Sequence, residues 1–173
     1  MGNQASPAVA PADAAERLAL WKRLADERVA MLGTRDGDGL PIARPVMPVR
    51  VESQGHVWLF TAIDGDIAHD IRRDARVHLV FVNPAQELYV SLNGTGAVFR
   101  DAAEARELWS PAAGVWYPGG ADDVNLGLVR IDVHRGDYWQ MKHGRLVRFF
   151  ELATAAVAGV RPDDVATHRR FEQ

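Results

Sequence analysis

The sequence predicts a mainly β, α+β domain: a small barrel of six to seven strands with helices packed outside it. Short apolar and β-branched segments recur between turn residues, without the regular strand–helix alternation of a parallel α/β sheet. The segment 40–52 has extended character but contains three prolines, which a sheet accommodates only at an edge or a bulge. These two observations together favour a barrel left open along one side.

The N-terminal residues 1–12 are small and polar, and we expect a flexible tail there. A helix follows, because Asp13 and Glu16 have the spacing of a capping box. Apolar residues at spacings of three and four then predict its buried face. These are Leu18, Trp21, Leu24, Ala25 and Val29. A strand over 29–34 and a hairpin turn at 36–39 complete this part of the chain.

The middle of the chain alternates extended segments with two helices. The predicted elements are, in order, a strand over 40–52, a strand over 56–62, a helix over 64–74, and strands over 76–82 and 87–100. Gly94 and Gly96 lie between strand-forming residues and predict a kink at a barrel corner, not a dinucleotide-binding turn. Asp101 and Glu104 form a second capping box, which opens a helix that extends to Trp109.

After a loop rich in tryptophan, proline and glycine, the pattern predicts strands over 126–133 and 138–141. The second strand is expected to form a hairpin with 146–150. A short helix over 152–158 and a polar tail over 161–173 would end the chain. The expected organisation is therefore a tail (1–12), one domain (13–151) and a C-terminal extension (152–173).

Composition narrows the classes of function. The 173 residues have a formal net charge of -3, which gives no support for a nucleic-acid surface. There is no cysteine, which excludes disulfides and thiolate chemistry. The six histidines lack metal-ligand spacings, so no metal is expected. No apolar run is long enough to cross a bilayer, so we expect no membrane partner and a cytoplasmic protein.

Two features stand out as candidate functional elements. Trp109 and Trp116 lie on the loop of 109–123, and their rings need a covering surface: the core, a ligand or a second subunit. Asp122 and Asp123 are expected to tie this loop together through backbone hydrogen bonds, not to act in catalysis. Arg44 lies in an otherwise apolar strand, so it is either exposed at an edge or buried with an anionic partner.

These motifs, in this order and spacing, resemble the general stress protein branch of the pyridoxamine 5'-phosphate oxidase-like flavin split-barrel superfamily. The resemblance extends from Ala14 to Phe150. The motifs that support it are Met31-Leu32-Gly33-Thr34, Arg44-Pro45-Val46, Trp58-Leu59-Phe60-Thr61, Asn93-Gly94-Thr95-Gly96-Ala97, Leu108-Trp109, the stretch from Trp116 to Asp123, and Tyr138-Trp139.

The resemblance implies a split β-barrel, FMN as cofactor, and a homodimer with the small-molecule site at its interface. It places Arg44 near the ribityl phosphate and the backbone of Pro45 and Val46 along the isoalloxazine ring. Further cofactor contacts that it implies are Phe60, Thr61, Ile67, Tyr89, Trp109 and Trp116, of which either tryptophan would come from the partner subunit. No catalytic residue is identified.

The chain departs from the family pattern where a serine and a lysine usually hold the phosphate. Gly65 and Ile67 occupy those positions, and Asp66 adds a negative charge. Three functions therefore stay open. The chain is a flavin-dependent oxidoreductase linked to stress, a flavin- or ligand-binding stress protein without turnover, or a member that has lost FMN and binds another ligand in the dimer cleft.

Overall fold

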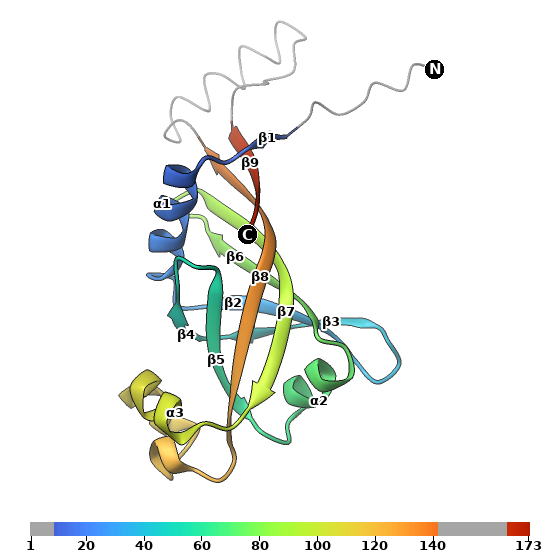
Figure 1. The fold of residues 1–173 in the computed structure, drawn as a ribbon, viewed down its shortest axis with the longest axis vertical. Coiled ribbons are helices and arrows are strands. Elements are labelled where there is room, and N and C mark those ends of the chain that lie inside the picture. Colours follow the sequence, from blue (N-terminus) through green and yellow to red (C-terminus); the bar gives the residue numbers. More distant parts are fainter. Residues whose placement is uncertain (1–8, 142–165) are drawn as a thin grey trace, which may run out of the picture.

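A single nine-stranded sheet forms the framework of the residues that the computed structural model describes, 9–141 and 166–173 (Figure 1). The strand order is β1-β9-β8-β7-β6-β2-β3, while β5 pairs with both β8 and β4. The strands are β1 (Ala10–Pro11), β2 (Ala30–Arg35), β3 (Pro41–Val46), β4 (Pro48–Val51), β5 (His56–Ala62), β6 (Arg76–Asn83), β7 (Leu88–Phe99), β8 (Leu126–Met141) and β9 (Ala166–Glu172). Because β3 and β4 do not pair with each other, the barrel stays open between them, and the mainly β split-barrel prediction is confirmed.

The proline-rich segment 40–52 is two strands, and the prediction of one strand is wrong. β3 pairs with β2 and β4 pairs with β5, so the chain changes partner at Met47. Pro48 has no N–H to continue the first ladder, which is the physical reason for the break. The expected place of this segment at a sheet edge is confirmed.

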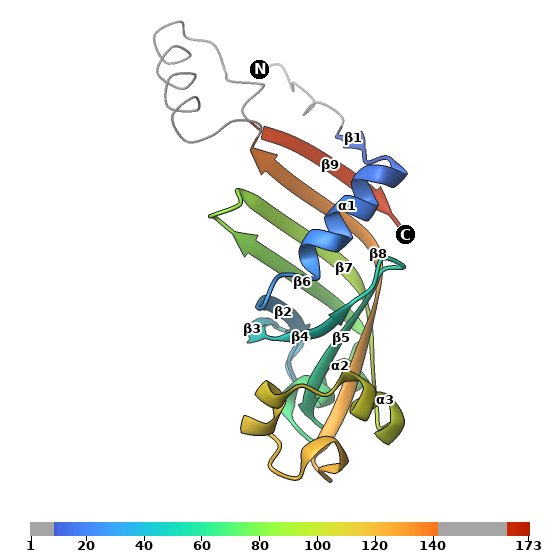
Figure 2. The same ribbon diagram turned by 90° about the vertical axis from the view of Figure 1, so that its left-hand side faces the viewer.

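Helix α1 (Ala14–Leu24) begins with the predicted capping box. The Asp13 side chain accepts a hydrogen bond from the Glu16 N–H at 2.8 Å, and the Glu16 side chain accepts one from the Asp13 N–H at 3.0 Å. Its buried face consists of Leu20, Trp21 and Leu24. α1 lies along one face of the sheet (Figure 2). Of the expected buried face, Leu18 is 45 % exposed, and Val29 lies beyond the end of the helix and is 53 % exposed, so the prediction is wrong for these two residues.

Two further helices lie at the other end of the molecule: α2 (Asp66–Arg73) between β5 and β6, and α3 (Ala102–Leu108) after β7. Asp101 caps α3 as predicted, by accepting from the Ala103 and Glu104 N–H groups. The reciprocal half of that capping box is replaced by a contact of Glu104 with Arg50 at 3.4 Å. Two 3-10 turns follow, at Pro111–Val115 and Gly120–Asp122.

The C-terminal part of the sheet differs from the sequence prediction. β8 is one strand of 16 residues where two were expected. β9 pairs with it antiparallel and buries Phe171, so the expected polar tail is wrong for this segment. The strand expected over 146–150 and the helix expected over 152–158 lie outside the described residues. At the other terminus, β1 pairs with β9, which places the end of the expected tail in the sheet.

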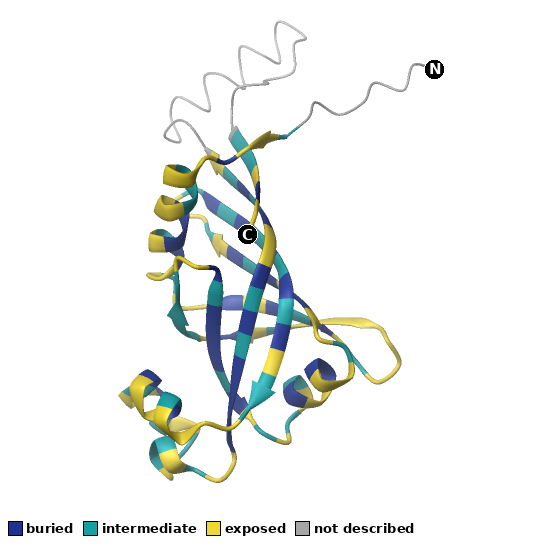
Figure 3. Cartoon of the chain, viewed as in Figure 1, coloured by how far each residue is buried: buried dark blue, intermediate teal, exposed yellow. Residues whose placement is uncertain are grey.

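Buried positions alternate along β6 and β7, as an inward-facing and an outward-facing side require (Figure 3). The buried apolar residues of the described chain form two clusters, one inside the barrel beneath α1 and the other beneath α3. At Gly94 the β7–β8 register shifts, and a side chain there would overlap the backbone of Asp132. The kink predicted at this glycine is therefore present as a β-bulge. Among the described residues, no helix is long and apolar enough to cross a membrane.

Candidate functional site

A cavity of about 430 Å³ opens where β2 and β6 separate. The two strands pair only from Met31 to Gly33, opposite Val80 to His78, and no pairing continues toward Arg35 and Arg76. The separation leaves room between the strands on the outer side of the sheet. The residues around it are Met31, Gly33, Thr34, Arg35, Pro41, Ile42, Ala43, Arg76, Val77, His78, Val80 and Asn93. Most of this lining is apolar and a few polar groups converge on it, which is typical of a small-molecule pocket.

Behind the cavity, Thr34 belongs to a buried polar triad. Its hydroxyl donates to Asp70 Oδ2 at 2.9 Å, and the Arg44 guanidinium donates to both the hydroxyl and the same carboxylate oxygen, each at 2.9 Å. The side chain of Asp70 is 7 % exposed and that of Arg44 is 23 % exposed. The anionic partner expected for a buried Arg44 is therefore an internal carboxylate, supplied by α2.

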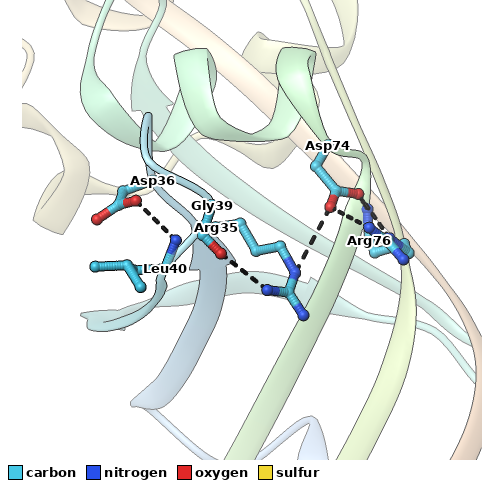
Figure 4. A network of polar contacts seen from close by, with 6 residues as sticks. All are labelled: Arg35, Asp36, Gly39, Leu40, Asp74 and Arg76. Atoms are coloured by element: carbon cyan, nitrogen blue, oxygen red, sulfur yellow. Dashed lines mark hydrogen bonds and ion pairs between the residues drawn. The ribbon is translucent and has the colours of Figure 1, made fainter.

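One rim of the cavity carries a second ionic network (Figure 4). Arg76 donates from Nε and from Nη2 to the two oxygens of Asp74, at 2.8 and 2.6 Å. Arg35 Nε lies 3.8 Å from the same carboxylate, and its Nη1 donates to the Gly39 carbonyl at 2.9 Å. The hydrogen bonds from the Arg76 side chain and backbone lower the pKa of Asp74 to about 2, and Asp74 in turn raises the pKa of Arg76.

The floor of the cavity offers polar groups of a different kind. His78 Nε2 lies 3.1 Å from the Ser91 hydroxyl on the neighbouring strand, and Asn93 lies opposite His78 in the β6–β7 ladder. The described residues contain no group of three or more side chains able to hold a metal ion. The cavity therefore combines the hydrogen-bonding groups of His78 and Asn93 with two guanidinium groups at one end.

Of the residues predicted for the site, those on β3 lie closest to this cavity. Ile42 and Ala43 line it, Arg44 contacts its Thr34, and Pro45 and Val46 continue the strand. Pro45 is exposed and Val46 is buried, as alternation along a strand requires.

The other predicted residues are dispersed. Phe60 packs against Trp109 and Tyr117 in the cluster beneath α3, with ring centroids 5.8 and 6.4 Å away. Its neighbour Thr61 is buried, with its side chain on the other side of β5 by strand alternation. Ile67 packs on the barrel cluster from α2. None of the residues predicted for the site, those on β3 included, is part of the cavity lining.

Tyr89 and Trp116 lie at two further places. Tyr89 is half-buried on the outer side of β7, between Val82 of β6 and Trp139 of β8. Trp116 is 74 % exposed on the loop after α3. The backbone role predicted for Asp122 and Asp123 is seen for Asp123, whose carboxylate accepts from the Gly119 and Asn125 N–H groups, whereas the Asp122 carboxylate accepts from the Arg106 side chain.

Sequence reasoning missed Asp70, Arg35 and Arg76. A signal existed for Asp70, because Ile67, Asp70 and Ile71 share one helical face by spacing, and a carboxylate on an apolar face needs a cation. Arg35 and Arg76 carried no such signal. Arg35 precedes a turn and Arg76 follows one, and both positions are exposed. Only the arrangement of the strands in the sheet places the two side chains at the same rim of the cavity.

Comparison with known proteins gives the family. The family model described as "Pyridoxamine 5'-phosphate oxidase like" matches residues 15–163. A solved general stress family protein from Xanthomonas campestris pv. campestris is 33 % identical, with a TM-score of 0.65 over 77 % of this chain and 92 % of that one. The general stress FMN/FAD binding protein from Xanthomonas citri is 31 % identical, with a TM-score of 0.65 over 74 % and 90 % of the two chains.

A solved structure from Jannaschia sp. CCS1, named as a general stress protein 26, is 27 % identical, with a TM-score of 0.69 over 88 % of this chain and 95 % of that one. The family match at residues 15–163 includes β2, β3 and α2. By its sequence match and its fold, this chain belongs to the pyridoxamine 5'-phosphate oxidase-like family.

Proposed function

We propose that this chain binds a flavin at β3, in and beside the cavity between β2 and β6. The observation on which this rests is the cavity itself. Its volume of about 430 Å³ lies within the range of small-molecule sites, and Ile42 and Ala43 of β3 form part of its apolar wall. The family resemblance assigns Arg44, Pro45 and Val46 of the same strand to the cofactor. Both lines of support therefore meet on one strand.

The start of α2 and the turn before it do not fit the phosphate of FMN. Asp64 and Gly65 of the turn and Asp66 and Ile67 of the first helical turn include two carboxylates and no cation. Helix N-terminal amides attract phosphate, but a carboxylate about 4–6 Å from a phosphate repels it by a few kcal/mol at an effective dielectric near 20. The charge of Arg44 is already balanced by Asp70. A flavin would therefore be held here mainly through its ring.

We extend the proposal to redox chemistry, with a role in stress that the names of the relatives suggest. A flavin supplies the electron transfer when it is bound, while the protein supplies shape, hydrogen bonds and exclusion of water. In this chain the apolar wall at Met31, Ile42 and Val80 would exclude water, and His78 and Asn93 would offer hydrogen bonds. NAD(P)H-dependent reduction of the bound flavin distinguishes an oxidoreductase from a binding protein.

We further propose that the chain is a homodimer. Val115, Trp116 and Val124 are 78, 74 and 72 % exposed on the segment after α3. Large apolar side chains grouped on one segment are typical of an interaction surface. A second copy of the chain is the occupant that the family resemblance implies, with the ligand close to the interface.

A second candidate function is favoured by the same turn before α2. A member that has lost FMN would keep the fold and the cavity while losing the phosphate-binding side chains, as Gly65 and Ile67 suggest. Such a protein would bind another flat ligand of similar size in the cavity.

Titration of the purified protein with FMN and with riboflavin, followed by flavin fluorescence, tests the proposal. We expect saturable binding of at least one of them at micromolar concentration. Ala43→Trp, which fills the cavity from its exposed edge, should abolish this binding and leave the unfolding transition in place. If neither flavin binds to the folded parent protein, the flavin proposal is wrong and the second candidate replaces it.

A further inference from the structure

We propose that a second cavity, between α1 and the β8–β9 part of the sheet, binds a small carboxylate that carries hydroxyl groups. Its volume is about 360 Å³, which lies at the lower end of the range for small-molecule sites. It shares no lining residue with the cavity between β2 and β6. This site is therefore separate from the proposed flavin site, and either can be absent without the other.

One side of α1 forms the first wall of this cavity. The lining residues on the helix are Glu16, Ala19, Leu20 and Arg23. Their spacing places them in a single stripe that extends over about 10 Å of the helix. The two charged residues occupy the ends of the stripe. The small side chain of Ala19 lies between them and leaves room against the sheet.

The sheet supplies three polar side chains as the second wall. Tyr138 and Gln140 lie on the same side of β8 by strand alternation, and Thr167 lies opposite Gln140 in the β8–β9 ladder. None of these side chains forms a hydrogen bond with another of the described residues. Tyr138 is only 6 % exposed, so a largely buried side chain brings an unpartnered hydroxyl to the cavity. Such a group favours a ligand that forms a hydrogen bond with it.

The charges around the cavity favour an anion. Glu16 already has partners, because Arg169 Nε lies 3.4 Å from its Oε1 atom and its Oε2 atom accepts from the Asp13 N–H. Arg23 is half-buried and donates only to the carbonyl and side-chain oxygens of Gln86, both at 3.4 Å. It forms no ion pair with a carboxylate of the described residues. A ligand carboxylate would supply the counter-charge that a half-buried guanidinium favours.

The ligand that matches both walls has a carboxylate at one end and hydroxyl groups beyond it. The carboxylate would accept paired hydrogen bonds from Arg23. Burial, together with the charge of Glu16, raises the pKa of the Tyr138 phenol, so this hydroxyl stays protonated and can donate to an oxygen of the ligand. An acid with an apolar chain would leave the polar side chains of the sheet wall without partners.

Gluconate is the probe for this site, and gluconamide is the matched compound without the charge. We expect the parent protein to bind gluconate with a Kd of about 1 mM or below, and at least tenfold more tightly than gluconamide. Chemical-shift titration by two-dimensional NMR measures both affinities. The preference for gluconate should fall as salt is added.

Arg23→Gln should remove most of this preference by weakening the binding of gluconate alone. Lys22→Gln is the matched control, because Lys22 is exposed on the same helix and does not line the cavity. Equal binding of the two compounds by the parent, full preference in Arg23→Gln, or no binding of gluconate at about 10 mM would overturn the proposed site. The flavin titrations would be unaffected by any of these results.

Tyr138→Phe tests the hydroxyl separately from the charge. It should weaken gluconate and gluconamide alike, by about threefold to tenfold. It should not lower the unfolding midpoint, because the hydroxyl has no partner among the described residues. A Tyr138→Phe variant that loses stability, or that binds both compounds as tightly as the parent does, would also overturn the proposed site.

Discussion

At the scale of single residues, the triad of Thr34, Asp70 and Arg44 shows how a charge is kept inside this barrel. A buried carboxylate is costly unless it is paired and hydrogen-bonded. Asp70 has both kinds of partner, since the guanidinium and the hydroxyl each donate to its Oδ2 atom. The triad joins α2 to β2 and β3, and Thr34 also lines the cavity. The wall of the cavity at Thr34 is therefore held by an ion pair whose carboxylate side chain is only 7 % exposed.

Asp70→Ala should lower the free energy of unfolding by about 2–3 kcal/mol, because it leaves the guanidinium of Arg44 largely buried without a counter-charge. Urea denaturation followed by tryptophan fluorescence measures this. His69→Ala, on the exposed side of the same helix, is the control and should change stability by no more than about 0.5 kcal/mol. Equal losses in the two variants would show that the ion pair contributes nothing beyond the helix itself.

The sequence indicates that Arg44 needs an anion, because its strand is otherwise apolar, but not which anion. Asp70 lies 26 residues away on a helix whose docking depends on tertiary packing. The same limit applies to Arg35 and Arg76. Their proximity arises because β2 and β6 separate beyond Gly33 and His78. No local sequence pattern indicates where the hydrogen bonding between two strands ends.

At the scale of elements, local signals predicted helix starts and turns well, and pairing partners poorly. The Asp13 and Asp101 caps are read within four residues, so sequence suffices for them. The division of 40–52 and the continuity of β8 are decided by strands far away in the chain. β9 was missed for the same reason, because its polar outward-facing residues conceal a strand whose buried position is Phe171.

The docking of β9 depends on a glycine in β8. Gly136 lies opposite Phe171, and a Cβ atom at Gly136 would come within 2.5 Å of the Phe171 ring. Phe171 in turn packs edge-on against Trp21 of α1, with ring centroids 5.9 Å apart. One close approach therefore connects β8, β9 and α1.

Gly136→Ala should lower the free energy of unfolding by about 1–3 kcal/mol, as overpacking in a filled core does. Phe171→Leu, which removes ring atoms from the contact, should recover part of that loss when combined with it. Gly114→Ala is the control, since its Cβ would meet only ordinary contacts, the nearest at 3.8 Å. Thermal unfolding of the parent, the two single variants, the double variant and Gly114→Ala checks this, and additive effects of the two substitutions would refute the proposed contact.

At the scale of the whole molecule, the two loop tryptophans have separate environments. The sequence predicts that both rings need cover but cannot distinguish core from interface. The structure places Trp109 against Phe60 and leaves Trp116 exposed beside Val115. The second apolar cluster is thus complete without Trp116, which makes this residue the strongest candidate for a contact with a second copy of the chain.

Trp116→Ala should therefore shift the proposed homodimer toward monomer, with at least a tenfold weaker association, equivalent to about 1.4 kcal/mol. Its unfolding midpoint, measured at low concentration where the parent also dissociates, should remain unchanged because the ring is not part of the core. Trp109→Ala is the matched variant. It should lower stability by about 3–5 kcal/mol through the loss of a packed aromatic. Analytical ultracentrifugation across a concentration series separates the two effects. A parent protein that sediments as a monomer at micromolar concentration would refute the dimer, and Trp116 would then be an exposed residue of the loop without a role in assembly.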